Sequence, residues 1–159
     1  MPNDFHGLPL HPLVVHATVV VIPLTALTVL LAALWPRFRA WAGPLPAALS
    51  LVGLILVPLS TSTGETLERH VPPSTLLEKH THLADGLLPW MLGLLAVSLI
   101  GYAVHRYGRD HSVHSFVTIV LVVSTVLAVA GTTTQVVRIG ESGAKAAWHN
   151  TDMTTSVRP

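Results

Sequence analysis

Residues 13–35 read LVVHATVVVIPLTALTVLLAALW, an apolar run without a single Asp, Glu, Lys or Arg. A helix that crosses the hydrocarbon core of a bilayer needs about 20 mostly apolar residues. Three further apolar stretches follow, from Pro44 to Thr61, from Leu83 to Val104 and from Ser115 to Val137, of which the first is the shortest. The pattern predicts an all-α integral membrane protein, a four-helix antiparallel bundle that uses the bilayer as its solvent.

The composition fits one membrane domain. Half of the 159 residues are hydrophobic and only 11% are charged, so we expect a single four-span domain at residues 1–148. The Gly-Glu-Ser-Gly segment at 140–143 predicts a turn into a short interfacial helix that ends at Trp148, and residues 149–159 predict a polar tail. No basic residue precedes the first apolar run and no small-residue cleavage site follows it, so we expect that run to stay in the mature protein.

Two composition features exclude whole classes of function. A net charge of +1 without any basic run gives no sign of nucleic acid as a partner. The chain has no cysteine, which excludes covalent c-type haem, thiolate-bound iron–sulfur clusters, disulfides and cysteine-based zinc sites.

Charge predicts how the bundle is oriented in the cell membrane. Four spans place both termini on one side. The two short connections on the other side, residues 36–43 and 105–112, hold four arginines against the single acid Asp110. Short loops rich in Lys and Arg face the cytoplasm, so we expect both termini to be extracytoplasmic. These arginines are Arg37, Arg39, Arg106 and Arg109.

The ten histidines gather near the predicted helix ends, and no charged residue lies in the middle of a span. Ion and proton pathways usually require ionisable residues deep in the bilayer, so the pattern argues against a pump or an ion-coupled transporter. Three histidines fall on the cytoplasmic side, where headgroup contact is expected. These are His105, His111 and His114, and the other seven, on the side of the termini, are His6, His11, His16, His70, His80, His82 and His149.

The starts of the first and third spans meet in any antiparallel four-helix bundle. His16 lies about one turn into the first span, and His80 and His82 flank the start of the third. Residues two apart on a helix point nearly opposite ways, so only one of His80 and His82 can face the interior. Glu65 and Asp85 add carboxylates at the same level. Imidazoles and carboxylates are ligands of haem iron, zinc and copper, although interfacial histidines also bond carbonyls and headgroups without any ligand.

The two hairpins are weakly alike. His16 precedes Pro23 by seven residues, as His82 precedes Pro89, and the second span of each hairpin ends in a hydroxyl-rich segment. The match favours a parallel duplication, in which His82 is the counterpart of His16. Chance similarity is the alternative, because Thr and Pro are common in membrane helices.

Four segments carry a resemblance to a known family. They are GLPLHPLVVH at 7–16, STGE at 62–65, EKHTHLAD at 78–85 and VVRIGESGAKAAW at 136–148. In their order and spacing the chain resembles the bacterial four-helix membrane domain of unknown function number two-two-three-one, in its actinobacterial form. The resemblance implies a small polytopic membrane protein. Some members are fused to, or lie near, Rieske-type iron–sulfur domains, which implies a respiratory redox partner.

The family pattern favours His80 over His82 and leaves three functions open. In the first, the protein binds b-type haem through His16 and His80 for electron transfer, or accepts electrons at a quinone site, with His11, Glu65 and Asp85 supporting the ligands. In the second, three histidines and Glu65 bind zinc or copper. In the third, the chain is a non-catalytic accessory or oligomerising subunit. No hydrolytic motif is present, which favours these roles over an enzyme. The marked residues are His11, His16, Gly64, Glu65, His80 and Asp85.

Overall fold

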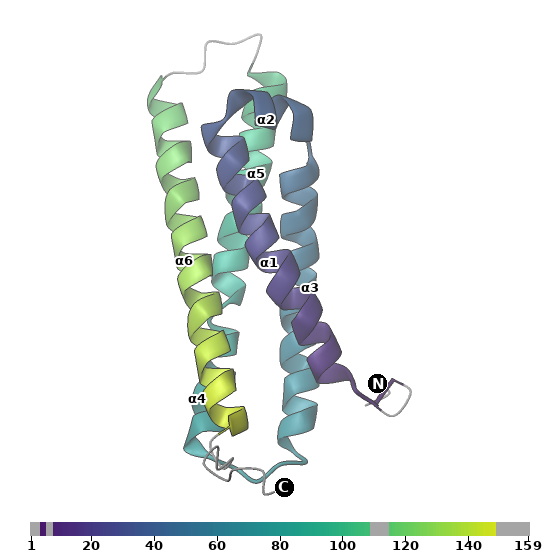
Figure 1. Ribbon diagram of the computed structural model, residues 1–159. Coiled ribbons are helices and arrows are strands. Elements are labelled where there is room, and N and C mark those ends of the chain that lie inside the picture. The colour runs from purple at the N-terminus through teal and green to yellow at the C-terminus, as the bar shows by residue number, and fades with distance from the viewer. Residues whose placement is uncertain (1–3, 6–7, 109–114, 149–159) are drawn as a thin grey trace, which may run out of the picture.

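A computed structural model describes residues 4–5, 8–108 and 115–148. Four helices long and apolar enough to span a membrane form an antiparallel bundle (Figure 1), which confirms the predicted fold class. The protein is therefore a multi-pass membrane protein. These helices are α1 (Leu10–Leu34), α3 (Leu45–Glu68), α5 (Leu88–Tyr107) and α6 (Ser115–Trp148). The shorter elements are α2 (Pro36–Ala42), α4 (Thr75–Asp85) and a hairpin of β1 (Asp4–Phe5) with β2 (Leu8–Pro9).

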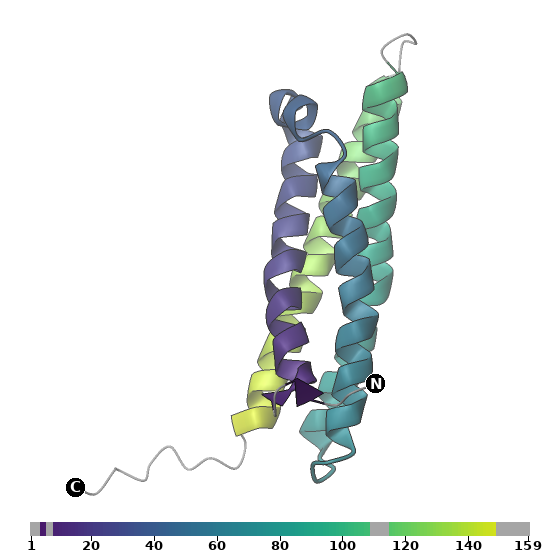
Figure 2. The same ribbon diagram turned by 90° about the vertical axis from the view of Figure 1, so that its right-hand side faces the viewer.

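The two ends of the bundle differ in what covers them. At one end α1 begins, α3 and α6 end, and α4 lies against α6 (Figures 1 and 2). We call this the α4 end. At the opposite end, which we call the α2 end, α2 connects α1 to α3, α5 ends and α6 begins. The start of α1 and the end of α6 thus share one end, as an even number of spans requires.

The third span is broken between α4 and α5, next to Pro89, a residue type that removes a helix hydrogen bond and bends a helix. Between α4 and α5 the Leu87 amide donates to the Ala84 carbonyl oxygen at 3.1 Å, which leaves the Leu83 carbonyl without its partner in a regular helix. The Gln135 side chain of α6 replaces that partner, and its Nε2 donates to the Leu83 oxygen at 2.6 Å. A Cβ atom on Gly86 would lie 2.8 Å from the same Nε2, so glycine makes room for the amide.

The fourth span corrects one expectation. The turn predicted at residues 140–143 is absent, and α6 continues as a helix to Trp148. Gly140 and Gly143 lower helix propensity, but packing of α6 against α4 outweighs that cost. The polar tail predicted at 149–159 lies outside the described residues, as do His6, His111, His114 and His149.

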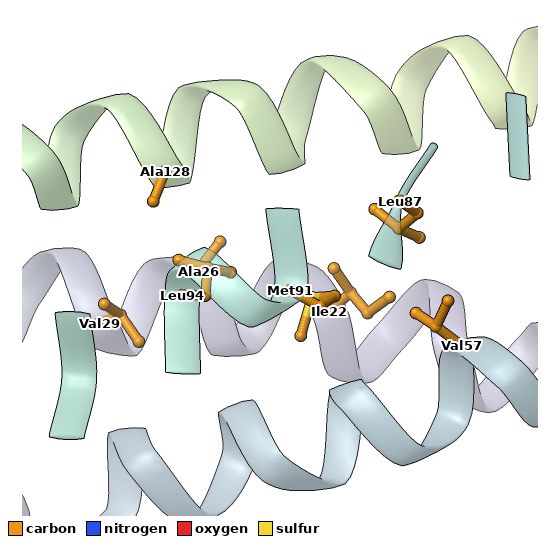
Figure 3. Packing of buried hydrophobic residues seen from close by; sticks show 8 residues of the cluster. All are labelled: Ile22, Ala26, Val29, Val57, Leu87, Met91, Leu94 and Ala128. Atoms are coloured by element: carbon orange, nitrogen blue, oxygen red, sulfur yellow. The ribbon is translucent and has the colours of Figure 1, made fainter. Parts of the chain in front are cut away.

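The core fills the middle of the bundle and combines large residues with small ones. The Met91 side chain is 0% exposed and packs over Gly53, where a Cβ atom would lie 2.5 Å from Met91 Cε. Small residues of this kind let membrane helices approach closely. Buried hydroxyls nearby donate to carbonyls of their own helices, as Thr25, Ser50, Thr125 and Thr132 do. Figure 3 shows the apolar cluster, formed by Ile22, Ala26, Val29, Val57, Leu87, Met91, Leu94 and Ala128.

Candidate functional site

His11 lies in the first turn of α1 and turns its ring onto the last turns of α3. Its Nδ1 is 3.2 Å from the Ser60 carbonyl oxygen and 3.3 Å from Thr63 Oγ1. The ring also packs against Gly64, where a Cβ atom would lie 3.1 Å from His11 Cε1. A hydroxyl and a glycine, adjacent in sequence, thus form the seat of this imidazole.

His80 lies on α4 and occupies an equivalent seat on α6. Its Nδ1 is 3.0 Å from Ser142 Oγ. A Cβ atom on Gly143 would lie 2.9 Å from His80 Cε1, closer than real Cβ contacts come, so this seat requires glycine. The segment read from sequence as a turn is therefore the helical seat of a half-buried histidine.

The two seats lie at the same end of the bundle, the α4 end. Here α1 packs on α3 and α6, and α4 packs on the same two helices, so α1 and α4 are diagonal partners. The His11 and His80 rings are close enough for an electrostatic interaction between their charged forms. The structure thus brings together one imidazole from each half of the chain.

The partners of each Nδ1 decide which nitrogen carries the proton in the neutral ring. A carbonyl oxygen only accepts, so His11 Nδ1 donates to Ser60. When the Ser142 hydroxyl donates to the Ile139 carbonyl oxygen, 2.9 Å away, its oxygen accepts from His80 Nδ1. The neutral His11 ring is therefore an Nδ1–H tautomer, and in that arrangement of Ser142 the His80 ring is one as well, so that each keeps a lone pair on Nε2. This is the form that binds metal ions through Nε2.

The other predicted site residues lie elsewhere at this end. His16 is exposed, and its Nδ1 bonds the Pro12 carbonyl oxygen of its own helix. Glu65 follows Gly64 but its side chain is exposed. Asp85 and His82 are exposed on α4, where they line a shallow depression. None of these four side chains has a hydrogen bond or ion pair to the ring of His11 or His80.

The described residues contain no group of three or more His, Cys, Asp or Glu side chains that could hold a metal ion. Residues 4–5, 8–108 and 115–148 therefore supply two imidazoles at the α4 end, but not the three or four protein ligands that a bare zinc ion usually takes.

Sequence reasoning missed the hydroxyl–glycine seats. Thr63-Gly64 and Ser142-Gly143 both combine a hydroxyl residue with a following glycine near the end of a long helix. This recurrence was the available signal. It was obscured because the second pair sits in a segment whose glycines resemble those of a turn.

The comparisons with known proteins establish the family of the chain. No curated protein and no solved structure matches it. The model of the family described as "Predicted membrane protein (DUF2231)" matches residues 7–155, nearly the whole chain. The resemblance read from the motifs is confirmed, and this chain belongs to that family of membrane proteins.

Proposed function

We propose that this protein binds b-type haem at the α4 end, where His11 and His80 would hold it, and uses it for electron transfer. The observation that carries the proposal is the pair of imidazoles at this end, each with its Nδ1 bonded to a partner on another helix. An imidazole fixed in this way presents its Nε2 lone pair in a defined direction.

The donor set fits haem better than a bare ion. Haem brings four nitrogen ligands of its own, so two imidazoles from diagonal helices would suffice to hold it. Zinc or copper without a porphyrin needs at least three protein ligands, and the described part of the chain places no such group together. Bound haem supplies one-electron redox chemistry. The protein holds the two rings and keeps their protons on Nδ1.

The hydroxyls take the supporting role that sequence reasoning gave to carboxylates. Thr63 and Ser142 contact the non-ligating nitrogens directly, whereas Glu65 and Asp85 are exposed. In the proposal these two carboxylates lie at the rim of the site. There they face a redox partner, for which the Rieske-type neighbours of family members are the model.

The proposed side of the membrane follows from charge. The α2 end carries Arg37, Arg39 and Arg106, which the positive-inside rule places in the cytoplasm. The imidazole pair is then at the extracytoplasmic face, accessible to a partner outside the cell membrane.

Absorption spectroscopy tests the proposal. The protein is purified in mild detergent, titrated with haemin and reduced with dithionite. We expect a Soret band that shifts on reduction and the spectrum of a bis-imidazole, low-spin iron. His11→Ala and His80→Ala each lose that spectrum. His16→Ala and His70→Ala, which remove exposed rings at the same end, keep it.

Three outcomes contradict the proposal. A protein that stays colourless after haemin titration excludes haem binding. Stoichiometric zinc or copper without haem, measured by elemental analysis, supports the bare-metal function instead. If the spectra and the metal content are identical in the wild type and all four variants, the remaining function is that of an accessory or oligomerising subunit.

A further inference from the structure

The α2 end is cationic and has no described countercharge. Arg37 and Arg39 lie on α2, and Arg106 lies in the last turn of α5. None of the described residues at this end is an Asp or Glu, and the one ion pair in the described part of the chain, Lys145 with Glu141, is at the α4 end. Counting the sequence of the loop at 109–114 adds one arginine and one aspartate, so the excess of positive charge remains.

Aromatic residues place these arginines at the level of lipid headgroups. Along α2, Phe38 stacks on Trp35 at 6.3 Å between ring centroids and lies 5.7 Å from Trp41. Trp41 is 77% exposed and Tyr107 is 69% exposed, and neither is needed in the core. Trp and Tyr gather at membrane–water interfaces because one side of each ring is apolar and its edge is polar.

Arg39 is the arginine whose position is most restricted. Its Nη2 lies 3.5 Å from the Ala33 carbonyl oxygen at the end of α1, and its Nε is buried without a hydrogen-bond partner. The side chain is half-buried, so the guanidinium is held near α2 rather than extended into solvent. Neither Arg39 nor Arg37 has a described carboxylate partner, so no described side chain competes with an anion from outside the protein.

We propose that the α2 end binds anionic phospholipids, with Arg37 and Arg39, which lie two residues apart and therefore on different faces of α2, each contacting a lipid phosphate. A guanidinium presents several N–H donors in a plane that matches a phosphate group. The exposed aromatic rings of α2 hold the helix at the depth where lipid phosphates lie. The occupant is the lipid headgroup because this surface faces a bilayer, whose anionic lipids attract clustered Lys and Arg.

Thermal unfolding in defined vesicles tests this inference. The full chain is reconstituted in phosphatidylcholine alone, and in phosphatidylcholine with one third phosphatidylglycerol. A ligand that binds only the folded state raises the unfolding midpoint, so the anionic lipid should raise it by several degrees. The Arg37→Gln and Arg39→Gln double variant should lose most of that rise. Arg69→Gln with Arg138→Gln, which removes two charges from the α4-end half of the bundle, should keep it.

The same measurements define the results that overturn the inference. Equal midpoints of the wild type in the two vesicles exclude a preference for anionic lipid, whatever the variants do. If the Arg69→Gln and Arg138→Gln control variant also loses the rise in unfolding midpoint, the effect comes from the total charge of the protein and not from the α2 end. A rise of the same size from inorganic phosphate in phosphatidylcholine vesicles identifies a free anion as the ligand instead of a lipid.

Discussion

Gln135→Met removes the side chain that bonds the Leu83 carbonyl oxygen at the break in the third span. Met is close to Gln in length and shape, but it cannot donate a hydrogen bond. The Leu83 carbonyl oxygen then loses the donor that lies 2.6 Å away, while the Leu87 amide remains bonded to Ala84. A carbonyl left unpaired at the edge of the hydrocarbon region is expensive, because lipid offers no replacement donor.

The size of the effect follows from two bounds. An unpaired buried polar group costs about 1–3 kcal/mol. Side-chain hydrogen bonds within a membrane protein average about 0.6 kcal/mol and reach about 1.7 kcal/mol. Gln135 is half-buried and its bond is short, so we expect a loss of about 1–2 kcal/mol in the free energy of unfolding. For a chain of this size the unfolding midpoint then falls by about 2–8 °C.

Unfolding in mild detergent, followed by near-UV circular dichroism, measures the loss. Thr134→Met is the control, since Thr134 is the exposed neighbour of Gln135 on α6 and receives the same Met side chain. Gly86→Ala removes the bond by steric displacement of the amide, so the double variant with Gln135→Met should cost no more than the larger single change. The reasoning is wrong if Gln135→Met is as stable as Thr134→Met, or if the two changes add.

Glycine substitutions give the remaining predictions. Gly143→Ala pushes the His80 ring from its seat and should weaken haemin binding about 10–100-fold in a spectroscopic titration, as loss of support for a ligand does. Gly140→Ala meets no atom within 4 Å and should leave haemin binding unchanged while raising helix stability by about 1 kcal/mol; equal haemin affinities of the two variants would refute the seat. Gly53→Ala should lower the free energy of unfolding by about 1–3 kcal/mol in denaturant titration, because the buried Met91 has to move; an unchanged midpoint would show that the core adapts without cost.

Span number and fold class were predictable because length and apolar composition decide them. Residues 13–35 leave no alternative to a membrane helix, and the described helix α1 covers all but the last of them. Pro89 signals a bend in the third span, but the bond that supports the break was not predictable in the same way. It comes from Gln135, 52 residues away in sequence from the Leu83 carbonyl that it bonds. Local propensity carries no information about such a partner.

Which histidine of α1 turns toward α3 is likewise decided by residues distant in sequence. His11 and His16 are five residues apart, which on a helix is a rotation of about 140°. Only one of the two rings can face α3, and their own neighbours in sequence do not say which. The face is decided by Thr63 and Gly64, because a hydroxyl supplies the acceptor and a missing Cβ supplies the space.

The same logic revises the internal repeat. Sequence alone aligned His16 with His82 through the spacing to a proline, whereas the structure relates His11 to His80 through their seats on α3 and α6. The spacing of a proline affects the path of one helix only, whereas a hydroxyl–glycine seat is a contact between two helices. Two halves of a chain place equivalent side chains at one site only if the contacts between their helices are repeated. The repeat that bears on function is therefore Thr63-Gly64 with Ser142-Gly143. These pairs identify His11 and His80 as the equivalent histidines, because their rings pack on them.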